Sequence, residues 1–196
     1  MSHAPFPEPF ALFADWFAAA KAKEVGDAEA MSLATATKAG APSSRIVLLR
    51  GCDERGFVFF TNHDSRKGGE LYANPLAALT FHWKSLQRQV RIEGRAEPVA
   101  DAEADAYFAK RARMSQIGAW ASEQSRELDS RATLERKTLE AEKRFGSDPI
   151  PRPPRWSGFR VVPARIEFWE ERPFRLHDRI VYARQGAGWR QFRLYP

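Results

Sequence analysis

Apolar residues recur along the chain with two different spacings. Near the N-terminus, Phe10, Phe13, Phe17 and Ala20 follow the spacing of one helix face, which predicts an amphipathic helix over residues 9–23. Beyond it, short apolar runs are separated by turn residues, a pattern typical of β-strands. The expected strands cover residues 31–37, 45–49, 57–61, 76–83, 88–93, 158–162, 165–169, 179–183 and 189–194.

Helical spacing returns in the middle of the chain. We expect Ser65 to cap a helix that ends near residue 73, and Asp101 to cap one that ends near residue 111. A short helical segment over residues 115–122 and a charged helix over residues 130–145 follow. Gly186 and Gly188 predict the turn of a C-terminal hairpin.

Short turns join most of the expected strands. This favours antiparallel pairing, because a doubly wound parallel sheet needs a helix between successive strands. The predicted fold is mainly β with helices: a closed or partly closed antiparallel barrel with an N-terminal helix and central helices. A chain of 196 residues fits a single domain over residues 1–196.

Composition narrows the classes of protein further. No apolar run approaches the roughly 20 residues of a membrane-spanning helix, so no membrane is expected. The segment Met1–Pro5 has no secretory signal, and the single cysteine, Cys52, suits a reducing cytoplasm. The histidines at positions 3, 63, 82 and 177 are too far apart in sequence for a zinc signature, so no metal is expected.

The charge of the chain points to an anionic ligand. Lysine and arginine number 31 against 25 acidic residues, and a net charge of +6 attracts nucleic acid, anionic lipid or phosphorylated small molecules. A nucleic-acid-binding barrel is the least favoured of these, because acidic residues are interspersed and there is no basic tail. Glycine-rich nucleotide loops and a Gly-x-Ser-x-Gly elbow are missing from the sequence, and His177 beside Asp178 is poor geometry for a triad. Kinases and hydrolases are therefore not expected.

Two clusters of basic residues beside predicted strands are candidates to contact a ligand. Ser65, Arg66 and Lys67 stand at a predicted helix N-terminus, where free N–H groups favour an anion. The alternative is a capped helix with solvated charges. Arg45 and Arg50 flank an apolar strand and point to opposite faces if that strand is regular. The alternative is an ordinary strand with charged ends.

Two further clusters complete the candidate chemistry. Residues 175, 177 and 179 share one face of an expected strand, and two arginines beside a histidine fit an anionic or electron-rich ring. The alternative is a basic surface ladder. Tyr107 and Arg111 are four residues apart on an expected helix, and Ser115 lies just beyond, so the three are candidates to hold a phosphate. The alternative is a helix surface without a ligand.

In chain order, these segments resemble the pyridoxine/pyridoxamine 5′-phosphate oxidase family from about residue 9 to residue 196. The resemblance rests on Arg45–Arg50, Val58–Asn62 with Ser65–Lys67, Arg88–Val90, Ser115–Trp120 with Gln124 and Ser125, Glu167–Trp169 with Arg175–Arg179, and Arg193–Pro196. It implies an FMN-binding split β-barrel that forms a homodimer, with FMN in the cleft between the subunits. It also implies the oxidation of pyridoxine 5′-phosphate or pyridoxamine 5′-phosphate to pyridoxal 5′-phosphate in vitamin B6 biosynthesis and salvage. In this family O2 reoxidises the flavin and yields H2O2, and the amine substrate releases ammonia.

The resemblance also implies site residues, position by position. The implied flavin contacts are Arg45, Ile46, Val47, Leu48, Leu49, Arg50, Phe60, Thr61, Arg66, Lys67, Gln89, Gln124, Ser125, Trp169 and Arg179, with Arg45, Arg66 and Lys67 as the main phosphate binders. The implied substrate contacts are Arg50, Tyr107, Arg111, Ser115, Arg175 and His177. Arg175 and His177 are the implied catalytic pair, which would cover the pyridine ring and hold C4′ against the flavin.

Two departures from the family pattern change the expectation. Position 50 is often lysine in the family, and Arg50 stands there in this chain, so we expect retained phosphate attraction with altered affinity. Some relatives have a longer N-terminal arm over the substrate, and here we expect a short lid or none. A different flavin enzyme on the same barrel, such as a phenazine-pathway oxidase or a flavin reductase, stays open because a fold does not fix a function.

Overall fold

The computed structural model describes residues 8–196. The segment Met1–Pro5, for which the sequence predicts no secretory signal, lies outside the described residues, as does any N-terminal lid. The strands are β1 (Ala30–Ala36), β2 (Pro42–Leu48), β3 (Gly51–Asp53), β4 (Gly56–Asn62), β5 (Leu76–Trp83), β6 (Arg88–Pro98), β7 (Trp156–Glu170), β8 (Asp178–Gln185) and β9 (Gly188–Arg193). The helices are α1 (Pro9–Lys23), α2 (Arg66–Ala73), α3 (Asp101–Ala109), α4 (Arg113–Ala121) and α5 (Arg131–Phe145), with short 3-10 turns at Lys84–Leu86 and Pro173–Arg175.

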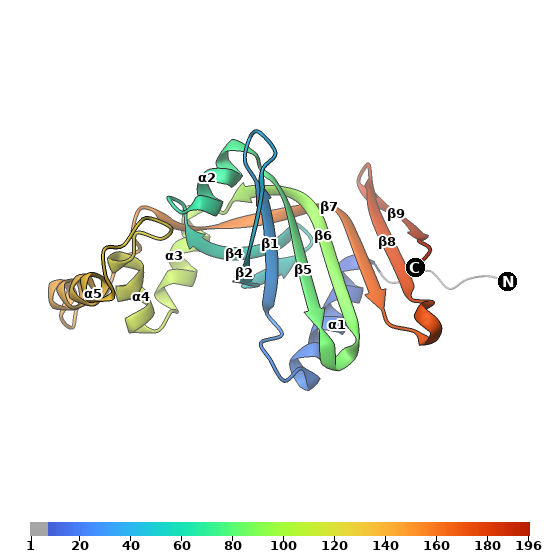
Figure 1. Cartoon of the computed structure of the whole chain (residues 1–196), viewed down its shortest axis with the longest axis horizontal. Coiled ribbons are helices and arrows are strands. Elements are labelled where there is room, and N and C mark those ends of the chain that lie inside the picture. The colour runs from blue at the N-terminus through green and yellow to red at the C-terminus, as the bar shows by residue number, and fades with distance from the viewer. Residues whose placement is uncertain (1–7) are drawn as a thin grey trace.

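All nine strands within residues 8–196 belong to one curled antiparallel sheet, which confirms the predicted fold class (Figure 1). The strand order is β2-β1-β5-β6-β7-β4-β3, and β8 and β9 branch from β7. One edge of β7 is shared, because its first half pairs with β4 and its second half pairs with β8. The sheet therefore divides at β7, and this gives the barrel its split.

A bulge lets β7 run as a single strand of 15 residues. The sequence predicts two strands there, over residues 158–162 and 165–169. In the structure Pro163 pairs with Gly94, at the point where the register between β6 and β7 shifts. A bulge is one of the few places inside a sheet that accept proline, so the prediction of a break is wrong.

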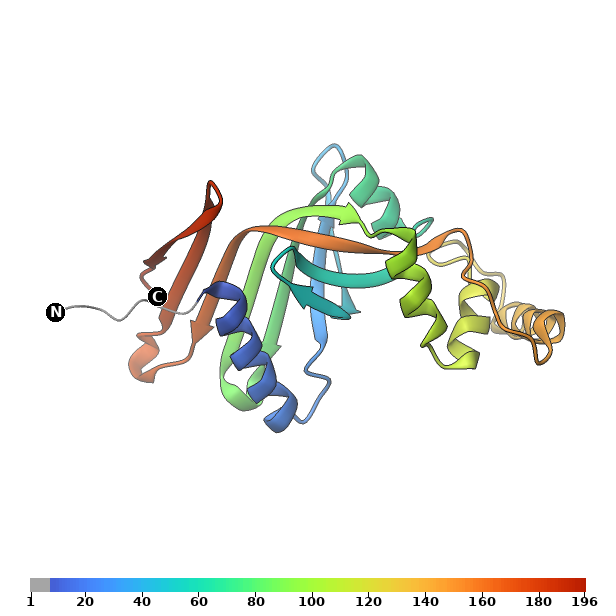
Figure 2. The same cartoon turned by 180° about the vertical axis from the view of Figure 1, so that it is seen from behind.

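The core of the barrel is rich in aromatic rings. Phe13 of α1 packs edge-on against Phe57, with ring centroids 4.9 Å apart, and tilts against Phe81 at 5.4 Å. The predicted amphipathic helix over residues 9–23 is confirmed, and it covers one face of the curled sheet (Figure 2).

Helices α3, α4 and α5 gather at one end of the sheet, beyond β4 (Figures 1 and 2). A second, smaller core of Phe108, Ile117, Phe145, Ile150 and Trp156 lies under them. The cap prediction at Asp101 is wrong, since Ala100 is the N-cap residue and makes no side-chain cap. No helix within residues 8–196 is long and apolar enough to cross a membrane.

Candidate functional site

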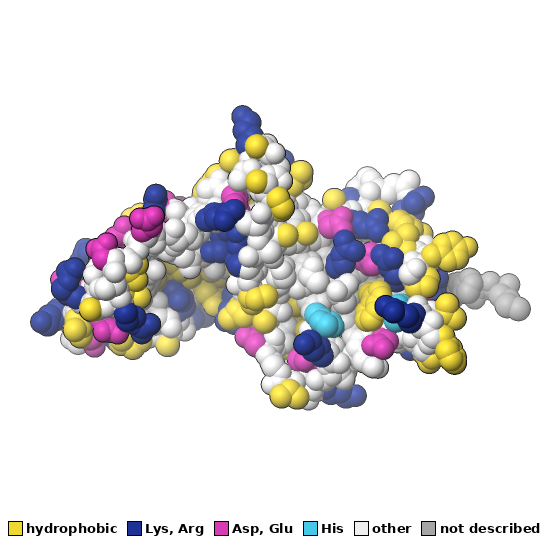
Figure 3. Space-filling view, viewed as in Figure 1, with side chains coloured by type: hydrophobic (Ala, Val, Ile, Leu, Met, Phe, Trp, Pro, Cys, Tyr) yellow, Lys and Arg dark blue, Asp and Glu magenta, His cyan; other side chains and the backbone are white. Residues whose placement is uncertain are grey.

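A cavity of about 900 Å³ opens between the sheet and the helical end of the molecule. Figure 3 shows basic side chains beside a recess on this side of the molecule. The lining residues come from β2, β4, α2, the α3–α4 region and the start of β7: Arg45, Ile46, Val47, Leu48, Arg50, Phe60, Thr61, Asn62, Lys67, Tyr107, Arg111, Ala112, Ser115, Gly118, Ala119, Ser122, Gln124 and Trp156. Most of the residues predicted from the first half of the chain thus meet in one place.

One end of the cavity is built around the amino group of Lys67. This Nζ donates to Oε1 of Gln124 at 2.8 Å, to Oγ1 of Thr61 at 3.2 Å and to Oγ of Ser65 at 3.4 Å. Burial, followed by the charge of Arg45, lowers the pKa of Lys67 to about 8. These three acceptors are neutral, so the ammonium charge remains available to an anion.

The first turn of α2 brings further donors to this end. Ser65 caps the helix by accepting from the backbone N–H of Gly68 at 3.4 Å, which confirms the predicted cap. Arg66 follows it, and its Nε donates to Oε1 of Glu70 at 2.9 Å. Within residues 8–196 nothing accepts from the two Nη atoms of Arg66, whose side chain is 62% exposed. Arg66 does not line the cavity itself.

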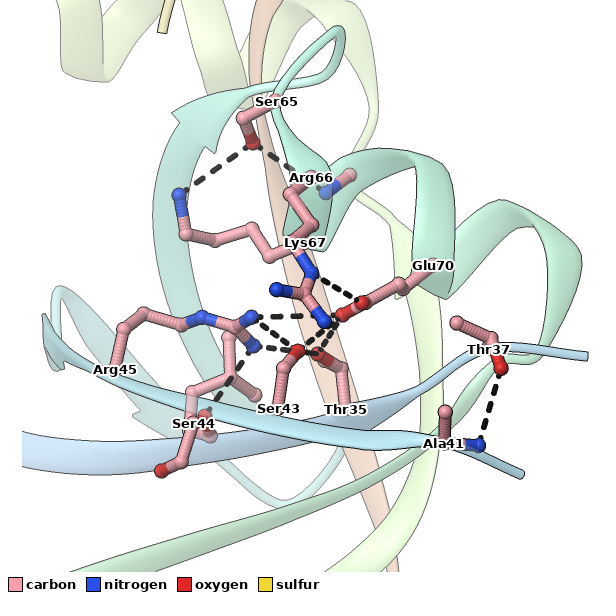
Figure 4. A network of polar contacts seen from close by, with 12 residues as sticks. Thr35, Thr37, Ala41, Ser43, Ser44, Arg45, Ser65, Arg66, Lys67 and Glu70 are labelled. Carbon is pink, nitrogen blue, oxygen red and sulfur yellow. Dashed lines mark hydrogen bonds and ion pairs between the residues drawn. The ribbon is translucent and has the colours of Figure 1, made fainter. Parts of the chain in front are cut away.

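A buried carboxylate holds the arginines of this corner. Oε2 of Glu70 accepts from Oγ of Ser43 at 2.6 Å and lies 3.4 Å from Nη2 of Arg45. Nη1 of Arg45 in turn donates to Oγ1 of Thr35. Figure 4 shows dashed contacts from the Glu70 carboxylate to the guanidinium groups of both Arg45 and Arg66. Burial would raise the pKa of Glu70, but hydrogen bonds from Ser43, Thr35 and Arg66 outweigh it and lower this pKa to about 2.

Parallel aromatic rings and a buried guanidinium form the other end. The rings of Phe60 and Tyr107 are stacked with centroids 4.0 Å apart, and those of Phe60 and Trp156 with centroids 5.4 Å apart. The Arg111 guanidinium carbon lies 4.8 Å from the centroid of the Trp156 ring. Its Nη1 is buried and has no hydrogen-bond partner among the described residues. Desolvation lowers the pKa of Arg111, and a buried donor of this kind favours a ligand that accepts from it.

Arg50 and Ser115 also line the cavity. Arg50 forms an ion pair with Glu29, and Ser115 is exposed in the first turn of α4. The prediction that Arg45 and Arg50 point to opposite faces applied only to a regular strand, and β2 ends at Leu48, so the alternation does not reach position 50. Both arginines reach the same cavity.

A second group of predicted site residues lies elsewhere on the sheet and does not line this cavity. Gln89, Trp169 and Arg179 are register partners on β6, β7 and β8, so their side chains share one face of the sheet. The ring of His177 lies 4.7 Å from that of Trp169, and Nε of Arg179 donates to Oε1 of Glu167 at 2.9 Å. The structure therefore brings the predicted site together as two separate groups.

The strand predicted through Arg175 and His177 is wrong. The backbone of Phe174 and Arg175 is left-handed, with φ of 59° and 63°, and β8 begins only at Asp178. Left-handed residues break the two-residue alternation of a strand, so these two side chains do not continue a face with Arg179. Leu49 is 4% exposed and part of the core, and Ser125 is in a loop; neither lines the cavity.

Sequence reasoning missed several residues of this site. Trp156 was not predicted, because its place depends on the pairing of β7 with β4 and has no local signal. Glu70 was missed although it stands four residues after Arg66, a spacing that predicts a helical ion pair. No group of three or more His, Cys, Asp or Glu side chains within residues 8–196 is arranged to hold a metal ion.

Fold and cavity together define a split-barrel protein with a cationic, aromatic-lined binding site. A family described as pyridoxamine 5′-phosphate oxidase matches residues 18–145, and one described as the pyridoxine 5′-phosphate oxidase C-terminal dimerisation region matches residues 156–196. The chain is 60% identical over 189 residues to the pyridoxine/pyridoxamine 5′-phosphate oxidase of Gluconobacter oxydans, covering 96% of this chain and 94% of the relative. It is 61% identical over 189 residues to the enzyme of that name from Sphingopyxis alaskensis, covering 96% and 88%. The chain belongs to the pyridoxine/pyridoxamine 5′-phosphate oxidase family, and it is an oxidoreductase.

Solved structures agree with this fold. PhzG from Burkholderia lata 383, in complex with tetrahydrophenazine-1-carboxylic acid, superposes with a TM-score of 0.92 at 36% identity, covering 98% of this chain and 94% of that one. An FMN-binding protein from Nostoc punctiforme related to pyridoxamine 5′-phosphate oxidase superposes with a TM-score of 0.77 at 19% identity, over the whole of both chains. At that identity the second likeness concerns the fold alone.

Proposed function

We propose that this protein uses FMN to oxidise pyridoxine 5′-phosphate or pyridoxamine 5′-phosphate to pyridoxal 5′-phosphate, with O2 as the electron acceptor. The products besides the aldehyde are H2O2 and, from the amine, ammonia, and the reaction serves vitamin B6 biosynthesis and salvage. The observation that carries the proposal is the arrangement of one cavity with cationic groups at two ends. Two phosphorylated ligands, a flavin mononucleotide and a vitamer, need two such groups.

The corner around Lys67 fits the phosphate of FMN. Lys67 offers an ammonium whose protein partners are neutral, and Arg66 keeps both Nη atoms free of protein acceptors among the described residues. Arg45 supplies a third cation, and Thr61 and Gln124 supply polar atoms beside Lys67. The neighbouring residues Ile46, Val47, Leu48 and Phe60 provide apolar walls for a flat ring system. When bound, FMN accepts the two electrons that the alcohol or amine carbon loses, and O2 takes them up afterwards.

The other end of the cavity fits the phosphate of the substrate. Arg111 has a buried Nη1 with no described partner, and Tyr107 and Ser115 add hydroxyl groups. Arg50 adds a second cation at this end, held by Glu29. In this proposal these side chains bind and orient the vitamer by its phosphate.

We propose a homodimer in which the second group of residues completes the site. Gln89, Trp169, Arg175, His177 and Arg179 are expected to contact the ligands, yet they do not line the cavity of their own chain. The family match over residues 156–196 is to a dimerisation region. This supports the proposal that these residues of one copy contact ligands in the cavity of a second copy. Arg175 and His177 of one copy would then orient the pyridine ring bound by the other copy.

We also propose that residues 1–196 form one domain, located in the cytoplasm. Strand β7 belongs to the C-terminal family match but pairs with β4 and β6 of the N-terminal one, which supports a single folding unit. Unfolding in one cooperative transition tests it. The lone cysteine supports a reducing compartment.

A cofactor and turnover experiment tests the function. The purified protein is expected to be yellow and to release FMN, not FAD, on denaturation. With FMN bound, pyridoxamine 5′-phosphate and O2 should give pyridoxal 5′-phosphate and H2O2 in equal amounts. FMN-loaded protein that produces neither from either vitamer would overturn the proposal.

One alternative has a specific observation behind it. The likeness to PhzG supports a flavin enzyme that acts on a phenazine precursor. We favour the vitamer because identity to the curated vitamer oxidases is about 60% against 36% to PhzG. Turnover of a tetrahydrophenazine carboxylic acid without vitamer turnover would select the alternative.

A further inference from the structure

A buried carboxylate lies beside the cations to which the proposed function assigns the FMN phosphate. Glu70 is only 6% exposed and is paired with Arg45 and Arg66, two of the three cations proposed for the FMN phosphate. A negative charge there repels phosphate, so its presence needs a compensating role.

The contacts of Glu70 supply that role. Its Oε1 accepts from Nε of Arg66 at 2.9 Å, on its own helix. Its Oε2 accepts from Thr35 at 2.5 Å and from Ser43 at 2.6 Å, and it lies 3.4 Å from Nη2 of Arg45. Thr35 and Ser43 are register partners on β1 and β2, so one carboxylate ties the start of α2 to two neighbouring strands (Figure 4).

We propose that Glu70 is a positioning residue that fixes the guanidinium groups of Arg45 and Arg66 for the FMN phosphate, an assignment that rests on the proposed function. Because Glu70 engages Nε of Arg66, it leaves both Nη atoms of that arginine for phosphate oxygens. It also reduces three positive charges to a net charge of about +2, which matches a phosphate of roughly −2. The low pKa of Glu70, about 2, keeps the carboxylate charged at any assay pH.

Two possible roles of Glu70, repulsion by its charge and anchoring of the arginines, predict opposite changes in FMN affinity when the residue is replaced. If its charge alone matters, both Glu70→Ala and Glu70→Gln bind FMN more tightly, because a repulsion is lost. If position matters, Glu70→Ala binds FMN more weakly, and Glu70→Gln, which keeps an acceptor oxygen, is partly rescued. We expect the second result, since a long arginine side chain without its anchor must be ordered by the ligand.

The test compares FMN with riboflavin, which lacks the phosphate. Flavin-free full-length chains are titrated with each flavin, and binding is followed by quenching of flavin fluorescence. For Glu70→Ala we expect the preference for FMN over riboflavin to fall about tenfold, with riboflavin affinity unchanged, and for Glu70→Gln about threefold. The matched control is Glu140→Gln, which breaks the same kind of ion pair on α5, with Arg136 at 2.9 Å, and should change neither affinity.

Each other outcome overturns the assignment. Equal losses for FMN and riboflavin, together with a lower Tm, would mean that Glu70 only supports the fold. Tighter FMN binding by both variants would mean that it only repels phosphate. An unchanged preference in Glu70→Ala would refute the assignment while leaving the proposed function standing. If the wild type binds both flavins equally, the proposed phosphate corner itself is wrong, and the role of Glu70 fails with it.

Discussion

Lys67 carries a charge that a modest rise in pH removes. Its pKa is lowered from 10.5 to about 8, first by burial and then by Arg45. A bound phosphate favours the charged form, so above pH 8 binding must be accompanied by the uptake of one proton. We therefore expect FMN affinity to weaken above pH 8, by up to about tenfold per pH unit. Fluorescence titrations between pH 6.5 and 9.5 measure this.

The matched variant for this prediction is Lys67→Arg, which stays charged across the whole range. Its FMN affinity should be nearly flat between pH 7 and 9. The stability of the flavin-free wild type should change in the opposite direction. Between pH 8 and 10.5 the unfolded chain holds the proton that Lys67 has lost, so this residue makes the folded chain more stable as pH rises. Parallel pH profiles for wild type and Lys67→Arg would contradict the role given to Lys67.

The variant Arg50→Lys tests whether arginine at position 50, where the family often has lysine, alters substrate binding. Arg50 lines the cavity beside the substrate end and is paired with Glu29. Lysine presents a point charge where arginine presents a fork, so Arg50→Lys should change the KM for pyridoxamine 5′-phosphate by about two- to tenfold. We expect kcat to stay within about twofold, because phosphate binding is the same in ground and transition states. Arg95→Lys, at an exposed position on β6, is the control. An unchanged KM together with unchanged flavin affinity would show that position 50 has no such role.

The contrast between Ser65 and Lys67 shows what sequence can predict at this scale. The Ser65 cap is a local property of a strand–helix corner, and it was predicted from a few neighbouring residues. The partners of Lys67 are different, because Gln124 is 57 positions away and reaches Lys67 only because the turn after α4 bonds to Thr61 and Asn62 at the end of β4. The resemblance to a family identified both Lys67 and Gln124 as site residues, but neither their spacing nor their charge predicts that they are in contact.

Among the elements, periodicity predicted α1, α2, α5 and most strands, because each has one buried face or an alternating pattern. It failed where the backbone departs from regular geometry. The bulge at Pro163 lets β7 continue through a residue type that usually ends a strand. The left-handed backbone of Phe174 and Arg175 interrupts the strand that the spacing of charged residues predicted there. Both are local backbone events that depend on a partner strand or on tertiary contacts, so the pattern of apolar residues does not contain them.

The β6–β7 bulge makes a prediction about stability. A Cβ atom on Gly94 would lie 2.1 Å from the carbonyl oxygen of Val162, and a backbone atom of a paired strand has little room to move. We expect Gly94→Ala to lower the free energy of unfolding by about 2 kcal/mol. Gly69→Ala is the control, because a Cβ there meets no heavy atom within 4 Å and alanine favours the helix. Urea unfolding with two equally stable variants would contradict the close packing of the bulge.

At the scale of the whole molecule, the predicted site residues fall into two groups on different parts of the sheet. The cavity group depends on β2, β4, α2, α3 and α4. The row of Gln89, Trp169 and Arg179 lies instead on β6, β7 and β8. A homodimer in which each site takes one group from each chain would explain why neither group is complete by itself. Sequence patterns within one chain do not distinguish contacts within a subunit from contacts between subunits.

Complementation between two inactive variants tests this arrangement. Arg111→Ala damages the cavity group, and Arg175→Ala damages the other group, so each homodimer should lose most of its activity. In a heterodimer of the two, one site combines both damaged groups, and the other combines two intact ones. Heterodimers purified with different tags should therefore show about half the wild-type rate, and a random mixture about one quarter.

The control pairs two variants of the same group, Arg111→Ala with Lys67→Ala. Every site in that mixture contains a damaged cavity, so no recovery is expected if sites are shared as proposed. If instead each chain carried a complete site, neither mixture would exceed the average of its two parents. Recovery in the first mixture alone requires that residues 111 and 175 act on the same substrate from different chains, because only a shared site can regain both groups intact.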